Sequence, residues 1–157
     1  MENTDNQNTL YQIAHVFHVT NTNAIIKLTD VDIVNKDSEN ILLSVCDDGW
    51  SGGSNVASLT AVKQELNGTI LVGSNSTLTL SITEGSSFEG YINGQITNAS
   101  GSVVSTDVGT VNVTLDSTST WTLTADIYVT SFNGNASNVI GNGYKLYVNG
   151  TALSGIN

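Results

Sequence analysis

The sequence contains no proline and no arginine, only four lysines, one cysteine and few aromatic residues. The single cysteine, Cys46, excludes a disulfide framework within the chain. No apolar run approaches the roughly 18 residues of a membrane helix, so we expect no membrane insertion. The formal net charge is −10. Because so few bases cannot neutralise phosphates, we also expect no binding to nucleic acid.

The residues that are abundant favour strands and turns. Serine, threonine, asparagine and glycine supply nearly half of the 157 residues, whereas good helix formers are scarce. The apolar residues recur in regular alternating runs instead of being diluted, which argues against disorder. We expect a polar N-terminal arm over residues 1–10 and a single all-β domain over residues 11–157.

Residues 76–90 and 109–123 are two copies of one unit at an offset of 33 positions. Alternating strands at such a period, with no helical pattern between them, indicate stacked coils that bury their apolar edges against one another. Comparable strands start near residues 24, 57, 78, 111 and 144. The sequence therefore predicts a β-solenoid of about five coils with a period near 33. The apolar positions of the copies coincide: Leu78, Leu80 and Ile82 with Val111, Val113 and Leu115, and Phe88 with Trp121.

An antiparallel sandwich or barrel is the alternative all-β architecture. Such a fold joins its strands through short turns, and Asn-Gly pairs, the strongest short hairpin signal, begin at positions 67, 93, 133, 142 and 149. The stacked coil is preferred because three of the four intervals between strand starts are equal.

Several phrases of the sequence carry a resemblance to a known family. They are FHVTNTNAIIKLTDVDI (17–33), TLTL (77–80), TVNVTLDSTSTWTLT (110–124) and NGYKLYVNGTAL (142–153). They resemble the C-terminal part of extracellular pectate-lyase-like adhesins and carbohydrate-binding proteins of anaerobic bacteria and archaea, over roughly residues 12–155. The resemblance implies a right-handed parallel β-helix at the cell surface that binds polysaccharide, often with calcium. Residues 1–7 do not look like a signal peptide, so we expect the leader to be absent from this chain.

The residues favour a binding module and not an enzyme. A lyase on this scaffold needs a basic residue to remove a proton, and the few lysines are scattered along the chain. A hydrolase needs paired carboxylates, which Asp47 and Asp48 imitate directly after Cys46. The histidine and arginine partners of that pair are missing, so we expect no catalytic residues.

One candidate calcium site surrounds the glycine-rich loop that follows residue 46. Asp47, Asp48 and Asn55 flank this loop, and calcium prefers such carboxylate, amide and carbonyl oxygens. A plain acidic turn is the alternative interpretation. A second carboxylate pair, Asp30 and Asp32, is expected to lie on a solvated strand face.

The aromatic residues separate into two groups by strand parity. Phe88 and Trp121 have inward parity and are expected in the core. Tyr128 and Tyr147 have outward parity, and Trp50 lies in the glycine-rich loop. We expect these last three to bind carbohydrate, because sugars commonly stack on aromatic rings.

Two further expectations concern the histidines and the ends of the solenoid. His15 and His18 are three residues apart in a strand, so alternation places them on opposite faces, where they cannot bind one metal together.

The main functional hypothesis is an adhesin-like module that binds a polysaccharide or cell-surface glycan. The alternative is a structural subunit that forms homo-oligomeric filaments, because open coil ends expose unpaired strand edges.

Overall fold

The computed structural model describes residues 2–3, 15–47, 54–97 and 101–157. Within these ranges the elements are β-strands, apart from one 3-10 helix, η1 (Ala136–Asn138). No helix in the described ranges has the length and apolar character needed to cross a membrane. The chain is therefore all-β, as the sequence predicted.

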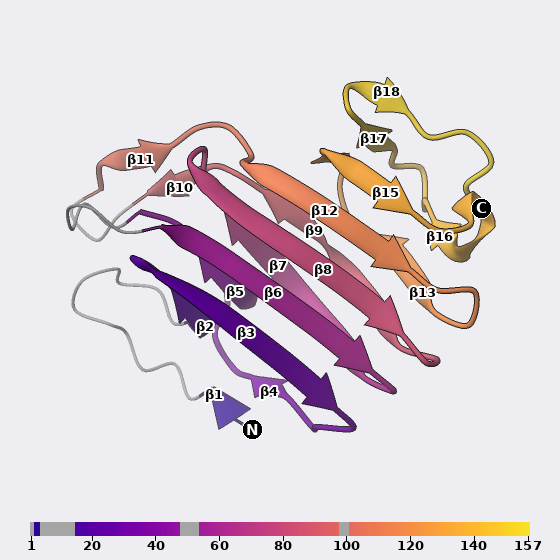
Figure 1. The fold of residues 1–157 in the computed structure, drawn as a ribbon, viewed down its shortest axis with the longest axis horizontal. Coiled ribbons are helices and arrows are strands. Elements are labelled where there is room, and N and C mark those ends of the chain that lie inside the picture. The colour runs from indigo at the N-terminus through magenta and orange to yellow at the C-terminus, as the bar shows by residue number, and fades with distance from the viewer. Residues whose placement is uncertain (1, 4–14, 48–53, 98–100) are drawn as a thin grey trace.

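Two parallel sheets form the body of the molecule and lie one in front of the other (Figure 1). The chain alternates between the two sheets, so that neighbouring strands within one sheet belong to successive layers of the stack. The front sheet contains β3 (Thr22–Thr29), β6 (Asn55–Val62), β8 (Ser76–Thr83), β12 (Thr110–Leu115) and β15 (Ser131–Asn133). The rear sheet contains β2 (His15–Val19), β5 (Ile41–Val45), β7 (Glu65–Val72), β9 (Ser87–Asn93), β13 (Thr120–Leu123) and β16 (Val139–Ile140).

Three smaller sheets lie at the margins. One holds β14 (Ile127–Val129), β17 (Leu146–Val148) and β18 (Thr151–Ala152). The others pair β10 (Ile96–Thr97) with β11 (Val103–Ser105) and β1 (Glu2–Asn3) with β4 (Val34–Asn35). Antiparallel pairing among the described strands is confined to β10–β11 and β17–β18. Because both main sheets are parallel throughout, the sandwich of antiparallel hairpins is wrong.

The register of the front sheet confirms most of the repeat. Ala24 pairs with Ala57, which pairs with Leu78, which pairs with Val111. The expected fifth start near residue 144 is wrong, because the next partner of β12 is β15, in which Ser131 pairs with Asn112. Leu146 instead pairs with Ile127 in the small sheet. The physical cause is that the chain after β13 contains only short strands, so the final pairings fall 18 or 19 residues apart.

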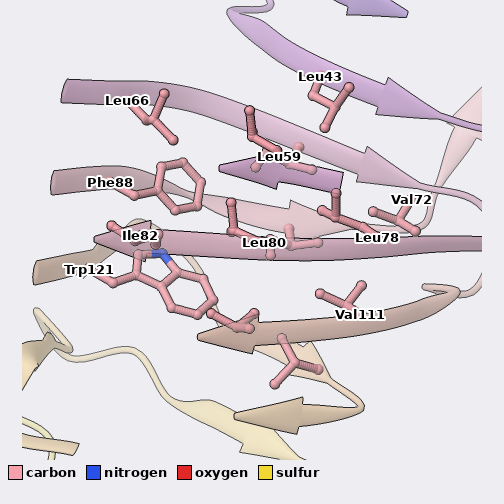
Figure 2. Close-up of a cluster of buried hydrophobic side chains, with 14 of the residues drawn as sticks. Leu43, Leu59, Leu66, Val72, Leu78, Leu80, Ile82, Phe88, Val111 and Trp121 are labelled. Carbon is pink, nitrogen blue, oxygen red and sulfur yellow. The ribbon is translucent and has the colours of Figure 1, made fainter. Parts of the chain in front are cut away.

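The core lies between the two main sheets and consists of the inward residues of alternating strands. Figure 2 shows leucine, isoleucine and valine side chains filling this space, with Phe88 beside Trp121. Both rings are completely buried, and their strands pair at this position. The ring centroids are 5.6 Å apart at an interplanar angle of 22°. The indole Nε1 donates to the carbonyl of Gly90 at 3.3 Å. The expected core position of both aromatics is confirmed.

Two glycines allow the rear strands to approach each other at this level. Gly68 and Gly90 pair across β7 and β9. A Cβ at Gly90 would lie 2.0 Å from the carbonyl oxygen of Gly68 and 2.7 Å from the Phe88 ring. Gly68 has a φ of +118°, a conformation that favours glycine. The aromatic stack therefore depends on the absence of a side chain at residue 90.

The turns that follow β8 and β12 are joined by polar side chains. The amide of Glu84 donates to Asp116 Oδ2 at 2.6 Å, and the amide of Gly85 donates to Thr118 Oγ1 at 2.9 Å. The amide of Ser86 donates to Ser119 Oγ at 3.1 Å. These side chains complete hydrogen bonds that the strand ladder no longer supplies. These two layers of the stack are thus connected beyond the ends of their strands.

The stacked indole gives the first prediction. Trp121→Ala removes the largest fully buried side chain and should lower the free energy of unfolding by about 3–5 kcal/mol. Urea denaturation measures this change, with Tyr144→Ala as a control because Tyr144 is 43% exposed. A loss below about 1 kcal/mol for the tryptophan variant would contradict its core position.

The turn carboxylate gives a second prediction. Burial raises the pKa of Asp116, but hydrogen bonds from Glu84, Ser119 and Thr118 outweigh it and lower the pKa from 3.8 to about 2. Because the folded pKa is the lower one, the ionised carboxylate stabilises the fold above about pH 4, and this contribution disappears as the pH falls toward 2.

Asp116→Asn should therefore lower the melting temperature at neutral pH and converge with the parent protein toward pH 2. The carboxylate lies at the surface, where solvent screening keeps its contribution below about 1 kcal/mol. Calorimetric scans at several pH values measure the difference, with Glu84→Gln as the control. A difference that persists unchanged to pH 2 would show that charge plays no part.

Candidate functional site

Two stacked tyrosines form an aromatic platform on the surface. Tyr128 in β14 pairs with Tyr147 in β17, and the rings stack with centroids 4.5 Å apart and an interplanar angle of 7°. Ile127 and Leu146 pair beside them and are fully buried, so strand alternation turns the tyrosines outward. Tyr128 is 51% exposed, whereas Tyr147 is half-buried. The outward parity expected for both residues agrees with this arrangement.

Tyr128 also borders a hollow of about 470 Å³. Tyr91 and Asn93, at the end of β9, line it from the rear sheet. Asp107 and Asp126 line it from the segments that precede β12 and β14. The hollow thus combines aromatic rings, an amide and two carboxylates, which is the mixture of groups found in small-ligand sites.

A close crossing of the backbone positions Asp107. A Cβ on Gly94 would lie 2.1 Å from backbone atoms of Asp107 and Val108, so only glycine allows this crossing. Ser74 and Ser105 both donate their hydroxyls to the Asp107 carbonyl at 3.2 Å. The close approach of Gly94 and the two serine hydrogen bonds therefore fix the backbone that carries the Asp107 carboxylate.

Each carboxylate of the hollow keeps one oxygen available. Asp126 Oδ1 accepts the backbone N–H of Lys145 at 2.9 Å. Asp107 Oδ2 accepts the hydroxyl of Thr106 at 3.0 Å. Among the described residues no hydrogen bond reaches the second oxygen of either carboxylate. These free oxygens can accept hydrogen bonds from a ligand.

Tyr91 connects this hollow with two others on the same side of the rear sheet. It lines a hollow of about 190 Å³ with His15 and Glu39, and another of about 220 Å³ with Asn67 and Glu89. Tyr91 was not predicted from the sequence as a site residue. The available signal was its outward parity in β9, where Phe88 and Ile92 are buried and Tyr91 is only half-buried.

Of the residues predicted to bind calcium, only Asp47 and Asn55 lie within the described residues. Trp50 and Asp48 lie outside the described residues. Asp47 is exposed after β5, whereas Asn55 is 4% exposed and accepts the backbone N–H of Asn21 at 2.8 Å. Asn55 is therefore a poor fit to a calcium ligand, because its oxygen is buried in a structural contact. The described residues contain no group of three histidine, cysteine or acidic side chains suited to a metal.

The histidines depart from the expected arrangement. His15 Nδ1 and His18 Nδ1 each lie 2.6 Å from Ser44 Oγ, and the ring centroids are 5.3 Å apart. The expectation that they occupy opposite faces is therefore wrong. The strand β2 lies at the end of its sheet among the described strands, and both rings turn toward the same hydroxyl on β5.

Burial lowers the pKa of His15 to about 4, assisted by the charge of His18 and opposed by that of Asp37. His15 is consequently neutral at physiological pH. Ser44 is completely buried, so its hydroxyl is inaccessible to a substrate. The cluster joins β2 to β5 and offers no accessible nucleophile.

Comparison with known proteins leaves the site to be interpreted on its own geometry. No protein-family model, no curated protein and no solved structure matches the chain.

The calcium site remains a prediction. Two variants distinguish its proposed ligands, Asp47 and Asp48, from the structural residue Asn55. If calcium binds beside the glycine-rich loop, Asp47→Asn/Asp48→Asn should abolish the calorimetric signal of calcium titration. Asn55→Ala should lower the free energy of unfolding by about 1–2 kcal/mol, because it removes the buried hydrogen bond from the Asn21 amide to the Asn55 side chain. Unchanged calcium affinity in the aspartate variant would exclude the assignment.

Proposed function

We propose that this protein is a non-enzymatic, extracellular or cell-surface module that binds a polysaccharide or a cell-surface glycan. For its fold we propose a right-handed parallel β-helix of about five coils, related to the pectate-lyase-like adhesins. Support for the solenoid comes from the alternation of strands between two parallel sheets and from the 33-residue offsets of their register.

The observation that carries the functional proposal is the exposed ring of Tyr128, supported from behind by Tyr147. Stacking on Tyr147 fixes the orientation of the platform before any ligand arrives. A pyranose presents an apolar face of C–H groups, which gains burial against such a ring. Hydroxyls at the edge of the sugar can then bond to the carboxylates and the amide of the adjoining hollow.

The length of the site favours a chain over a single sugar. Three hollows meet at Tyr91, and together they extend along the outer side of β5, β7 and β9. A monosaccharide would occupy one of them, whereas an oligosaccharide can contact several in succession. Binding several weak subsites at once is how a surface of modest depth achieves useful affinity.

Assembly into filaments is the second candidate function. It is favoured by β3, an eight-residue strand at the end of the front sheet whose Ile25 is 89% exposed. At the opposite end the chain terminus pairs with β16, because the amide of Asn157 donates to the Val139 carbonyl at 2.9 Å. This contact occupies an edge that filament growth would need. Electron microscopy of the pure protein would reveal filaments directly.

The proposed glycan site predicts the effect of removing its exposed ring. Tyr128→Ala should weaken binding of the preferred oligosaccharide about 5- to 10-fold, because an aromatic contact contributes about 1 kcal/mol. A glycan array identifies the oligosaccharide, and isothermal titration calorimetry then measures its affinity. Tyr144→Ala is the matched control, since Tyr144 is also exposed but lines none of the three hollows.

Equal losses in both tyrosine variants would place binding elsewhere on the molecule. Failure of the parent protein to bind any glycan on the array would contradict the proposed function.

A further inference from the structure

We propose that the hollow between Tyr91 and Tyr128 takes a glycan that carries free amino groups, in preference to an acidic or a fully acetylated glycan. This inference rests on the proposed function and specifies the chemical class of its ligand. It follows from how the charged groups are distributed around the aromatic platform.

The stacking of the two tyrosines limits where a sugar ring can lie. One face of the Tyr128 ring is covered by Tyr147, so its exposed half is on the remaining face and edge. Tyr128 borders the hollow that Tyr91 lines from β9. A sugar ring that enters the hollow is therefore placed between the two tyrosines, within reach of Asp107 and Asp126.

The carboxylates of the hollow favour a positively charged ligand. Each carboxylate of the hollow has one oxygen engaged by a neighbouring donor and one oxygen without a partner among the described residues. The free oxygens are charged acceptors, and an ammonium group is the donor that pairs with them most strongly. Tyrosine rings also attract cations through their electron-rich faces. Aromatic rings and carboxylates therefore favour the same positively charged ligand.

The acidic residues around the three hollows disfavour an anionic ligand. Glu39 and Glu89 line the two neighbouring hollows, so all three carry acidic groups. No lysine is among the described residues that line them, and the sequence contains no arginine. A uronate chain would bring further carboxylates into this field without a cationic partner. The net charge of −10 adds long-range repulsion of the same sign.

Three hexasaccharides test the inference by calorimetry in low salt with a chelator present. They are a glucosamine hexamer, the N-acetylglucosamine hexamer with the same backbone but no charge, and a galacturonic acid hexamer. We expect the glucosamine hexamer to bind most tightly and to lose affinity when salt is added. Asp107→Asn/Asp126→Asn should weaken its binding about 5-fold, as expected for two partly exposed ion pairs, and leave the N-acetylated hexamer unaffected.

A matched variant distinguishes a local effect from a change in net charge. Asp30→Asn/Asp32→Asn removes the same number of charges, but these residues line a different hollow near β4. It should retain nearly the affinity of the parent protein for the glucosamine hexamer. Circular dichroism confirms that both double variants are folded.

The outcomes separate this inference from the function on which it rests. Equal affinity for the charged and acetylated hexamers, tighter binding of the galacturonic acid hexamer, or equal losses in the two double variants would overturn the amino-glycan inference. If any hexamer that still binds loses affinity in Tyr128→Ala, the proposed function stands. Absence of binding by all three hexamers overturns the inference, and the wider glycan array then decides the proposed function.

Discussion

The structure depends on the in-register stacking of parallel strands, in which an apolar residue of one layer lies on an apolar residue of the next. Parallel pairing supplies backbone hydrogen bonds, but it does not select among registers by itself. The selection comes from side chains such as Phe88 and Trp121, which pair and stack in the core. A slip by one residue would turn the indole to solvent and bring Thr120 or Thr122 inward.

Side-chain identity reveals the repeat, so most of the ladder could be predicted from the sequence. The pairing of Leu78 with Val111 follows from the 33-residue repeat, and the burial of Trp121 follows from alternation. The last layer could not be predicted in this way. The strand around Leu146 has the right alternation to continue the front sheet, yet it pairs with Ile127. Parity fixes the face of a strand but not its partner.

The candidate site was accessible to sequence reasoning only in part. Outward parity identified Tyr128 and Tyr147, but nothing local indicates that Tyr91 and Asp107 lie beside them. Their proximity depends on the crossing over Gly94, a contact between segments that are distant along the chain. For the histidines, strand alternation led to a wrong prediction. Alternation separates His15 from His18, whereas the Ser44 hydroxyl brings both rings together.

The front sheet accepts layers of different lengths without losing register. Ala57 and Leu78 are aligned across 21 residues, whereas Leu78 and Val111 are aligned across 33. The longer layer between β8 and β12 contains β10 and β11 and leads into Asp107, so the hollow beside Tyr128 is lined in part by this additional chain. Insertions in such excursions leave the stacked core unchanged. The scaffold can therefore acquire or exchange recognition surfaces by lengthening single layers, which uncouples the evolution of specificity from that of stability.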